Sequence, residues 1–173
     1  MTPKLSDAAI VAGAEAAFID PAAGAADLVH VRALFREYQE WLGVDLCFQG
    51  FDDELRRLPG RYAPPLGLLL LARVGSAIAG GVGMWPLSET VCEMKRLYVR
   101  PPWRGVGLGR RLANAIVAEA RNMGFARMRL DTLARLEAAR ALYASMGFVD
   151  IPAYYDNPLD GVLFMELRLA KHA

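Results

Sequence analysis

Seven residues in the middle of the chain constrain its fold more than any others: Arg104-Gly105-Val106-Gly107-Leu108-Gly109-Arg110. They follow an apolar stretch that ends at Val99 and precede a segment whose apolar residues recur at helical spacing as far as Met123. Glycines at alternate positions let successive backbone N–H groups turn toward one point, and a helix N-terminus adds partial positive charge there. The segment therefore predicts an anion-binding turn between a strand and a helix. Its two arginines favour a diphosphate over a single carboxylate.

Other phosphate-binding patterns fit this turn less well. A nucleotide-triphosphate loop would end in Gly-Lys-Ser/Thr, whereas this turn ends in Gly109-Arg110-Arg111. A dinucleotide fingerprint gains some support from Asp131, which lies near the end of the following strand at about the right distance for a ribose contact. Its third glycine would fall at Arg110, however, and the preceding strands read as antiparallel. A glycine-rich turn that binds nothing is a third open interpretation.

The chain is long enough for one domain and too short for two large ones, because domains usually hold roughly 100–200 residues. Its 173 residues are 54% hydrophobic and 23% charged, which is typical of a globular protein. We therefore expect a single domain over residues 1–173, with residues 1–15 as a flexible tail.

Periodicity and turn residues give the order of elements. The expected strands are Phe18–Pro21, Leu66–Ala72, Ala77–Trp85, Thr90–Val99, Met128–Thr132, Phe148–Ile151 and Val162–Leu169. The expected helices are a stretch capped by Asp27 that runs to Leu42, then Asp52–Leu58, Leu108–Met123 and Leu136–Met146. This order predicts an α+β fold, with a mixed and mostly antiparallel sheet that carries helices on both faces.

Charge and cysteine content exclude several classes of protein. The 20 basic and 19 acidic residues leave a formal net charge of +1, too small for binding nucleic acid by phosphate neutralisation alone. No apolar run is long enough for a membrane span, and the start does not resemble a signal peptide, so we expect a cytoplasmic protein without a membrane partner. Cys47 and Cys92 lack the paired spacing of a zinc site, so we expect free thiols and no metal.

Two motifs together carry a family resemblance. Glu93-Met94-Lys95-Arg96-Leu97-Tyr98-Val99-Arg100-Pro101, followed by the glycine-rich turn, resembles the acyl-CoA-binding motif of the GCN5-related N-acetyltransferases (GNAT family). Leu142-Tyr143-Ala144-Ser145-Met146-Gly147-Phe148 is similar to that family's second motif. The resemblance covers residues 91–148. It implies a splayed sheet, acetyl-CoA as co-substrate between two parted strands, and acetyl transfer to a primary amine by direct attack.

The resemblance also implies a cofactor site. Backbone groups of Leu97 and Val99 would pair with the pantetheine arm, and the turn would hold the pyrophosphate. The cofactor-binding residues expected on this basis are Leu97, Val99, Arg104, Gly105, Val106, Gly107, Leu108, Gly109 and Arg110. One position departs from the family pattern: Leu136 stands where family members often carry an asparagine that touches the pantetheine arm or a water.

Acetyl transfer to an amine needs a proton acceptor and a proton donor. A lysine-like amine has a pKa of about 10.4, so only roughly one molecule in two thousand is neutral at pH 7. Glu93, on the strand that would present the thioester, is the candidate base; a surface glutamate fits the sequence equally well. Tyr143 is the family's usual donor to the departing sulfur. Helical spacing alone favours a core aromatic there, whereas the intact motif favours the acid.

The acceptor is poorly specified by the sequence. The family builds its acceptor pocket from the segments that correspond to Gly43–Phe51 and Tyr154–Pro158, and it takes small-molecule or peptide amines. Side chains that could attract a cationic amine there are Asp45, Asp52, Asp53, Tyr154 and Asp156, although Asp156–Asp160 also fits a plain turn.

Other charged and aromatic residues receive plainer interpretations. We expect most of Lys95, Arg96 and Arg100 to be solvated, and Trp41 and Trp85 to be packing residues. A homodimer is compatible with the sequence. The alternative function is a non-catalytic acyl-CoA-binding sensor, which would keep the turn and dispense with Glu93 and Tyr143.

Overall fold

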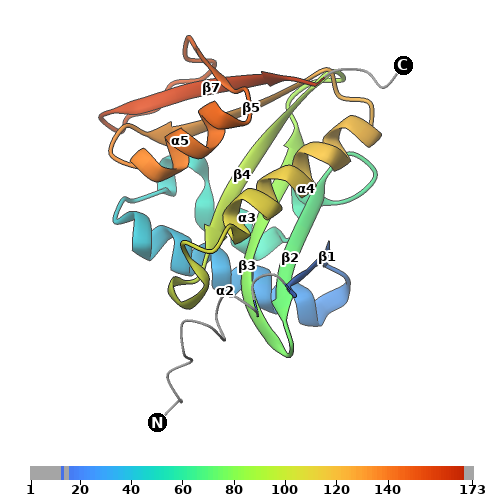
Figure 1. The fold of residues 1–173 in the computed structure, drawn as a ribbon. Helices are drawn as coiled ribbons and strands as arrows, with labels where there is room; N and C mark the ends of the chain where they lie inside the picture. The colour runs from blue at the N-terminus through green and yellow to red at the C-terminus, as the bar shows by residue number, and fades with distance from the viewer. Residues whose placement is uncertain (1–12, 14–15, 170–173) are drawn as a thin grey trace.

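The computed structural model describes residue 13 and residues 16–169 (Figure 1). The expected tail at residues 1–15 therefore lies almost wholly outside the described residues. The strands are β1 Phe18–Pro21, β2 Leu68–Val74, β3 Ala77–Pro86, β4 Val91–Val99, β5 Arg127–Leu133, β6 Val149–Ile151 and β7 Val162–Arg168. The helices are α2 Gly24–Leu42, α3 Phe51–Arg57, α4 Leu108–Asn122 and α5 Glu137–Ser145, with short 3-10 turns η1 Cys47–Gln49, η2 Gly60–Tyr62 and η3 Pro101–Trp103.

The described strands form one open sheet in the order β1-β2-β3-β4-β5-β7-β6, in which the β4–β5 pair is parallel and the other pairs are antiparallel. Helices α4 and α5 cover the face seen in Figure 1, and α2 and α3 cover the opposite face. Each face has its own apolar core: Ile116 and Met84 lie in one, and Phe35 and Leu71 in the other. The predicted α+β fold, with a mostly antiparallel sheet between helices, is confirmed.

The parallel pair β4–β5 comes apart along its length. The two strands are paired only from Val91 with Arg127 to Glu93 with Arg129. Beyond that point β5 continues beside β7 as far as Leu133, whereas β4 continues beside β3. The sheet is therefore splayed, and the backbone of β4 after Glu93 has no β5 partner.

A bulge in β4 lies where the strands part. The register with β3 shifts between Gly81 and Gly83, and at this point β4 has one residue more than its neighbour. Arg96 has a φ of 58°, a left-handed backbone conformation that is uncommon for any residue but glycine. The extra residue breaks the strict alternation of the strand, so that the consecutive side chains of Lys95 and Arg96 both reach the α2/α3 face.

Two expectations from the sequence are wrong in this region. Lys95 and Arg96 are not solvated, since only 7% and 6% of their surfaces are exposed. Arg96 instead forms a bidentate ion pair with Glu54 of α3 (Nη2–Oε2 2.8 Å, Nε–Oε1 3.3 Å), and Glu54 also accepts a hydrogen bond from the Tyr62 hydroxyl (2.7 Å). The prediction assumed that side chains alternate regularly between the two faces of β4, and the bulge at Arg96 interrupts that alternation.

The start of α2 also differs from its prediction. The helix begins at Gly24, with Ala23 rather than Asp27 at the N-cap position. Asp27 lies in the first turn, where its carboxylate accepts a hydrogen bond from the Ala23 N–H (2.8 Å) and pairs with Arg73 (2.8 Å). A negative charge is favourable there because it faces the positive end of the helix dipole.

Candidate functional site

The glycine-rich turn has the geometry of an anion cradle. Gly105 and Gly107 have φ values of 77° and 85°, and an added Cβ at either would meet open space. Gly107 is the N-cap of α4. From Gly105 to Arg110, no backbone N–H donates a hydrogen bond to an acceptor within the described chain. Six unpaired amides at a helix N-terminus fit a diphosphate.

The arginines beside the turn are fixed by their own contacts. The Arg104 Nε donates to the Val99 carbonyl (2.7 Å), and its guanidinium lies over the ring of Trp41 (5.0 Å). Arg110 donates to Ser145 Oγ (2.8 Å) and so ties α4 to α5. Both side chains are exposed at this end of the molecule, where they can meet a phosphate.

A row of three depressions runs from the turn to Gln49 of η1. The first is a shallow groove lined by Trp41, Leu97, Tyr98, Val99, Arg104, Gly105, Gly109 and Ala138. It shares Trp41 and Leu97 with a second depression, which reaches Tyr143. The second shares Lys95 and Asp131 with a third, which also reaches Gln49. The structure thus brings the predicted cofactor residues Leu97, Val99, Arg104, Gly105 and Gly109 to one groove that leads between the parted strands.

Tyr143 lies at the middle of this row. Its side chain is 8% exposed, and its ring packs against that of Phe148, with the centroids 5.7 Å apart. The ring is therefore a core aromatic, as helical spacing predicted. Within the described chain its hydroxyl makes no hydrogen bond, and the residue lines the second depression. Burial raises the pKa of the Tyr143 hydroxyl, so this group keeps its proton at neutral pH.

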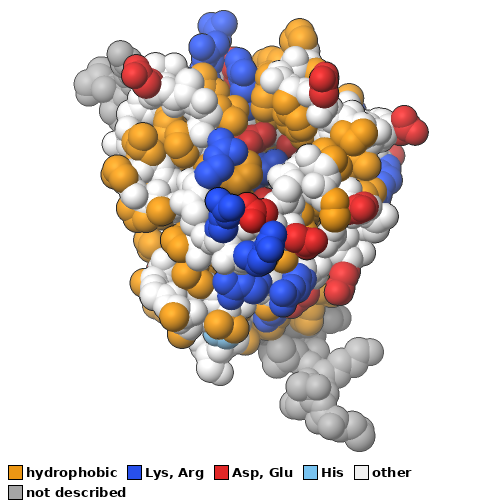
Figure 2. All heavy atoms as spheres, turned by 180° about the vertical axis from the view of Figure 1, so that it is seen from behind, with side chains coloured by type: hydrophobic (Ala, Val, Ile, Leu, Met, Phe, Trp, Pro, Cys, Tyr) orange, Lys and Arg blue, Asp and Glu red, His pale blue; other side chains and the backbone are white. Residues whose placement is uncertain are grey.

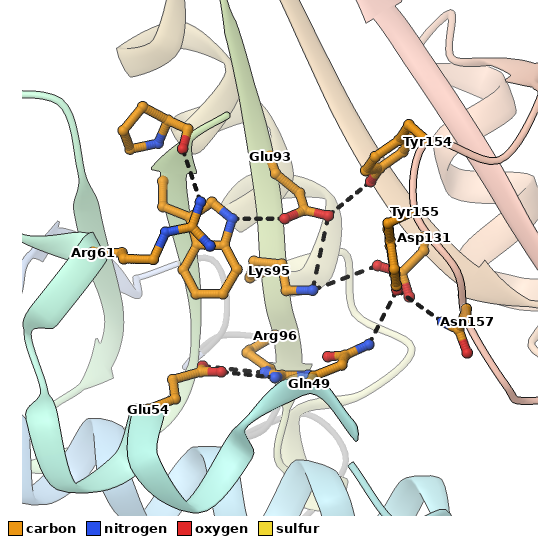
Figure 3. Close-up of polar contacts among 12 residues, drawn as sticks. Gln49, Glu54, Arg61, Glu93, Lys95, Arg96, Asp131, Tyr154, Tyr155 and Asn157 are labelled. Atoms are coloured by element: carbon orange, nitrogen blue, oxygen red, sulfur yellow. Dashed lines mark hydrogen bonds and ion pairs between the residues drawn. The ribbon is translucent and has the colours of Figure 1, made fainter. Parts of the chain in front are cut away.

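Glu93 is buried, at 3% exposure, which rules out the surface-glutamate interpretation. Its Oε2 accepts a hydrogen bond from Trp85 Nε1 (2.6 Å), and its Oε1 accepts one from the Tyr154 hydroxyl (2.7 Å) (Figure 3). Burial, reinforced by the Glu93 charge, raises the pKa of Tyr154, so the tyrosine remains a donor. The predicted acceptor segment at Tyr154–Pro158 therefore does reach the candidate base.

A second carboxylate, Asp131 of β5, lies beside Glu93 in the parted region. Lys95 Nζ bridges the two, at 3.5 Å from Asp131 Oδ1 and 3.9 Å from Glu93 Oε1. Burial and then the Asp131 charge raise the pKa of Tyr155, which places that ring near the carboxylate. Tyr155 in turn accepts hydrogen bonds from Gln49 (3.2 Å) and Asn157 (2.8 Å). The two predicted acceptor segments, around Gln49 and Tyr155, thus meet here (Figure 3).

A further pocket, of about 410 Å³, opens beyond Gln49. Its lining residues are Gln49, Gly50, Asp53, Glu54, Arg57, Pro59, Gly60, Arg61, Tyr62 and Trp85. The Arg61 guanidinium lies 4.0 Å from the Trp85 ring centroid and donates to the Pro86 carbonyl (3.0 Å). Because Gln49 lines both this pocket and the depression around Asp131, the two adjoin.

The roles of several of these residues have no signal in the sequence. Asp131 was considered only for a ribose contact, and the contacts of Trp85 and Arg61 depend on segments far apart in the chain. Two of the carboxylates expected to attract an amine are held by other groups. Asp45 accepts a hydrogen bond from the Cys47 N–H (2.8 Å), and Asp53 lines the pocket beyond Gln49 but pairs with Arg57 (2.8 Å). Trp41 is 44% exposed rather than packed in the core.

Neither thiol has the environment of a nucleophile. Burial raises the pKa of Cys92 to about 12, and a hydrogen bond to Asp45 raises that of Cys47. In the described ranges, no three His, Cys, Asp or Glu side chains come together in a way that could hold a metal ion. Every helix in the same part of the chain is too short or too polar to cross a bilayer.

The chain is similar to known proteins in sequence and in fold. The model of the acetyltransferase (GNAT) family matches residues 30–148. The uncharacterized N-acetyltransferase C1271.07c of Schizosaccharomyces pombe is 43% identical over 148 residues, which are 84% of this chain and 90% of that protein. A GNAT-family acetyltransferase from Staphylococcus aureus superposes with a TM-score of 0.73 at 18% identity, over 89% of this chain and 99% of that one. The structure of yncA from Salmonella typhimurium with its cofactor acetyl-CoA gives 0.67 at 22% identity, over 91% and 96%.

Proposed function

Because this chain belongs to the GNAT acetyltransferase family and is an acyl-CoA-dependent N-acyltransferase, we propose that it transfers an acetyl group from acetyl-CoA to a primary amine by direct attack. One arrangement carries the proposal. The groove beside the glycine-rich turn leads between β4 and β5 to a depression lined by Tyr143 and Asp131.

The residues of the turn fit the cofactor. The unpaired amides of Gly105 to Arg110 would bind the diphosphate, Arg104 and Arg110 would add charge, and the backbone of Leu97 and Val99 would bind the pantetheine arm. Leu108 is 1% exposed, so it would contribute its amide and not its side chain. Acetyl-CoA supplies an activated thioester whose carbonyl carbon accepts an amine.

Removal of the amine proton requires a base. We assign this role to Glu93. Its side chain does not line the described depressions, so it would reach the amine through one bridging water. Trp85 and Tyr154 hold both of its oxygens and so fix its orientation. Asp131 lines the depression directly and is the second carboxylate within reach of an acceptor. Variants of Glu93 and Asp131 therefore separate the two assignments.

The departing thiolate requires a proton donor, and Tyr143 is proposed for this role. Its hydroxyl has no described protein partner and keeps its proton because burial raises its pKa. A covalent acyl-enzyme is disfavoured because the pKa values of both thiols are raised, so neither forms a ready nucleophile. These observations favour attack by the acceptor amine itself.

The test is release of CoA from acetyl-CoA, followed with a thiol reagent across a panel of amines, with acceptor-free hydrolysis subtracted. The proposal predicts acceptor-dependent release and an acceptor that is heavier by one acetyl group in mass spectrometry. Binding of acetyl-CoA with no release on a broad panel would instead support the non-catalytic sensor.

A further inference from the structure

The pocket beyond Gln49 contains a cation without a carboxylate partner. Its two carboxylates are engaged elsewhere: Asp53 pairs with Arg56 and Arg57, and Glu54 pairs with Arg96. Among the described residues, Arg61 forms no ion pair. The positive charge that Arg61 brings to the pocket is therefore not balanced by a neighbouring carboxylate.

The Arg61 side chain is exposed, and two contacts orient its guanidinium. It lies over Trp85 at 4.0 Å, and one Nη2 proton is donated to the Pro86 carbonyl. Trp85 is itself held by its hydrogen bond to Glu93 (2.6 Å). The Nε and Nη1 groups of Arg61 donate to no acceptor in the described chain. A guanidinium that is held in one orientation, with free donors, suits the planar oxygens of a carboxylate.

The adjoining depression has the opposite polarity. Asp131 lines this depression, and Glu93 lies behind it, at 3.9 Å from the Nζ of Lys95. Two carboxylates therefore face the single positive charge of Lys95, since the neighbouring Arg96 is paired with Glu54. An ammonium group is therefore favoured at this end, close to the parted strands. Figure 2 shows the α2/α3 face of the molecule, where Lys and Arg side chains form a band beside carboxylates.

We propose that the acceptor is a small primary amine that also carries a carboxylate, with its amine toward Asp131 and its carboxylate bound by Arg61. The two ends would bridge the neighbouring pockets past Gln49, which lines both. This inference rests on the proposed acetyl transfer and adds the chemical class of the acceptor. Arg61 is in this view the residue that selects for the anionic group.

The experiment compares acceptors that differ only in that group. A series of ω-amino acids with one to five methylenes is assayed beside the matching carboxamides, and kcat/KM is measured for each with wild type, Arg61→Gln and Arg61→Lys. The ratio of the acid to its carboxamide is then compared between enzymes, because differences in amine reactivity and any common effect of the substitution cancel. Arg36→Gln, which removes an exposed charge from α2 outside this pocket, is the matched control.

The inference predicts that the best acid exceeds its carboxamide in wild type and that Arg61→Gln lowers the ratio about 3- to 10-fold, because Arg61 is exposed and water screens its interaction with a carboxylate. Arg61→Lys should restore part of the ratio, and Arg36→Gln should leave it unchanged. An unchanged ratio in Arg61→Gln, or an equal drop in Arg36→Gln, would overturn the inference while acetylation of the carboxamides upholds the proposed function. Failure of every amine to support release, with acetyl-CoA bound, would overturn both.

Discussion

The ion pair between Arg96 and Glu54 gives the sharpest prediction about how the site is held together. This pair links α3 to the bulge where β4 parts from β5. Arg96 is, among the described residues, the one non-glycine residue with a left-handed backbone conformation. Glu54→Gln keeps the shape of the side chain and removes its charge. We expect this variant to be less stable and, below its melting temperature, to turn over more slowly, because the bulge positions Lys95 and the backbone of Leu97.

The magnitude follows from burial. The Arg96 and Glu54 side chains are only 3% and 9% exposed, and the pair is bidentate. Removing one partner of a buried ion pair typically costs about 3–5 kcal/mol. Glutamine retains one acceptor oxygen, so we expect about 3 kcal/mol, toward the lower end of that range. In a domain of this size that corresponds to a fall in Tm of about 6–12 °C.

The assay is thermal unfolding followed by calorimetry, with Glu37→Gln as the matched control. Glu37 pairs with Arg100 at 2.7 Å, but those side chains are 35% and 26% exposed. This pair is half-buried, so water screens it more than the Arg96–Glu54 pair and its loss should cost less. The control should therefore melt at a higher temperature than Glu54→Gln. If Glu54→Gln melts no lower than Glu37→Gln, the ion pair does not hold the bulge and this reasoning is wrong.

Three further predictions concern the chemistry. Tyr143→Phe should lower kcat by about 10²–10⁴-fold and leave the calorimetric affinity for acetyl-CoA within a few-fold of wild type; an unchanged kcat would remove Tyr143 from the reaction. Because burial raises the pKa of Tyr143 above its ordinary value of 10, its donor form persists as pH rises, so kcat should not decline between pH 7 and 10. A decline near pH 8 would contradict that assignment. Glu93→Gln should lower kcat by about 10²–10⁴-fold, as expected for a lost base, whereas Asp131→Asn should chiefly raise the acceptor KM; the reverse pattern would make Asp131 the base.

Much of the fold could be predicted from the sequence because the signals were local. β1 matches its prediction at both ends, and the other strands begin and end within about two residues of the positions that turn residues and apolar runs indicated. The glycine-rich turn lies between β4 and α4 as expected, because positive φ at Gly105 and Gly107 is a property of those residues themselves.

The parts that could not be predicted depend on contacts between distant segments. A left-handed Arg96 has no local signature, since its conformation is supported by Glu54, 42 residues earlier. The burial of Glu93 depends on Tyr154, 61 residues later. The pocket around Arg61 forms only when η2 packs against β3. No pattern along one strand or helix contains this information.

The most direct test of the central claim is the affinity of acetyl-CoA for a chain with a charge placed in the cradle. Gly107 and Gly124 stand at opposite ends of α4, with φ values of 85° and 87° and open space at the Cβ position of each. Gly107→Asp and Gly124→Asp therefore impose similar backbone strain on the same helix, and aspartate tolerates this conformation better than most residues. Gly107→Asn separates the effect of charge from that of bulk.

If the amides of Gly105 to Arg110 hold the diphosphate, the new carboxylate at position 107 lies within about 5 Å of it. At an effective dielectric constant near 20, two unit charges at that distance repel by about 3 kcal/mol, which is on the order of 100-fold in Kd. Isothermal titration should show that loss for Gly107→Asp, a smaller one for Gly107→Asn, and wild-type affinity for Gly124→Asp. Equal affinities in Gly107→Asp and Gly124→Asp would contradict the account.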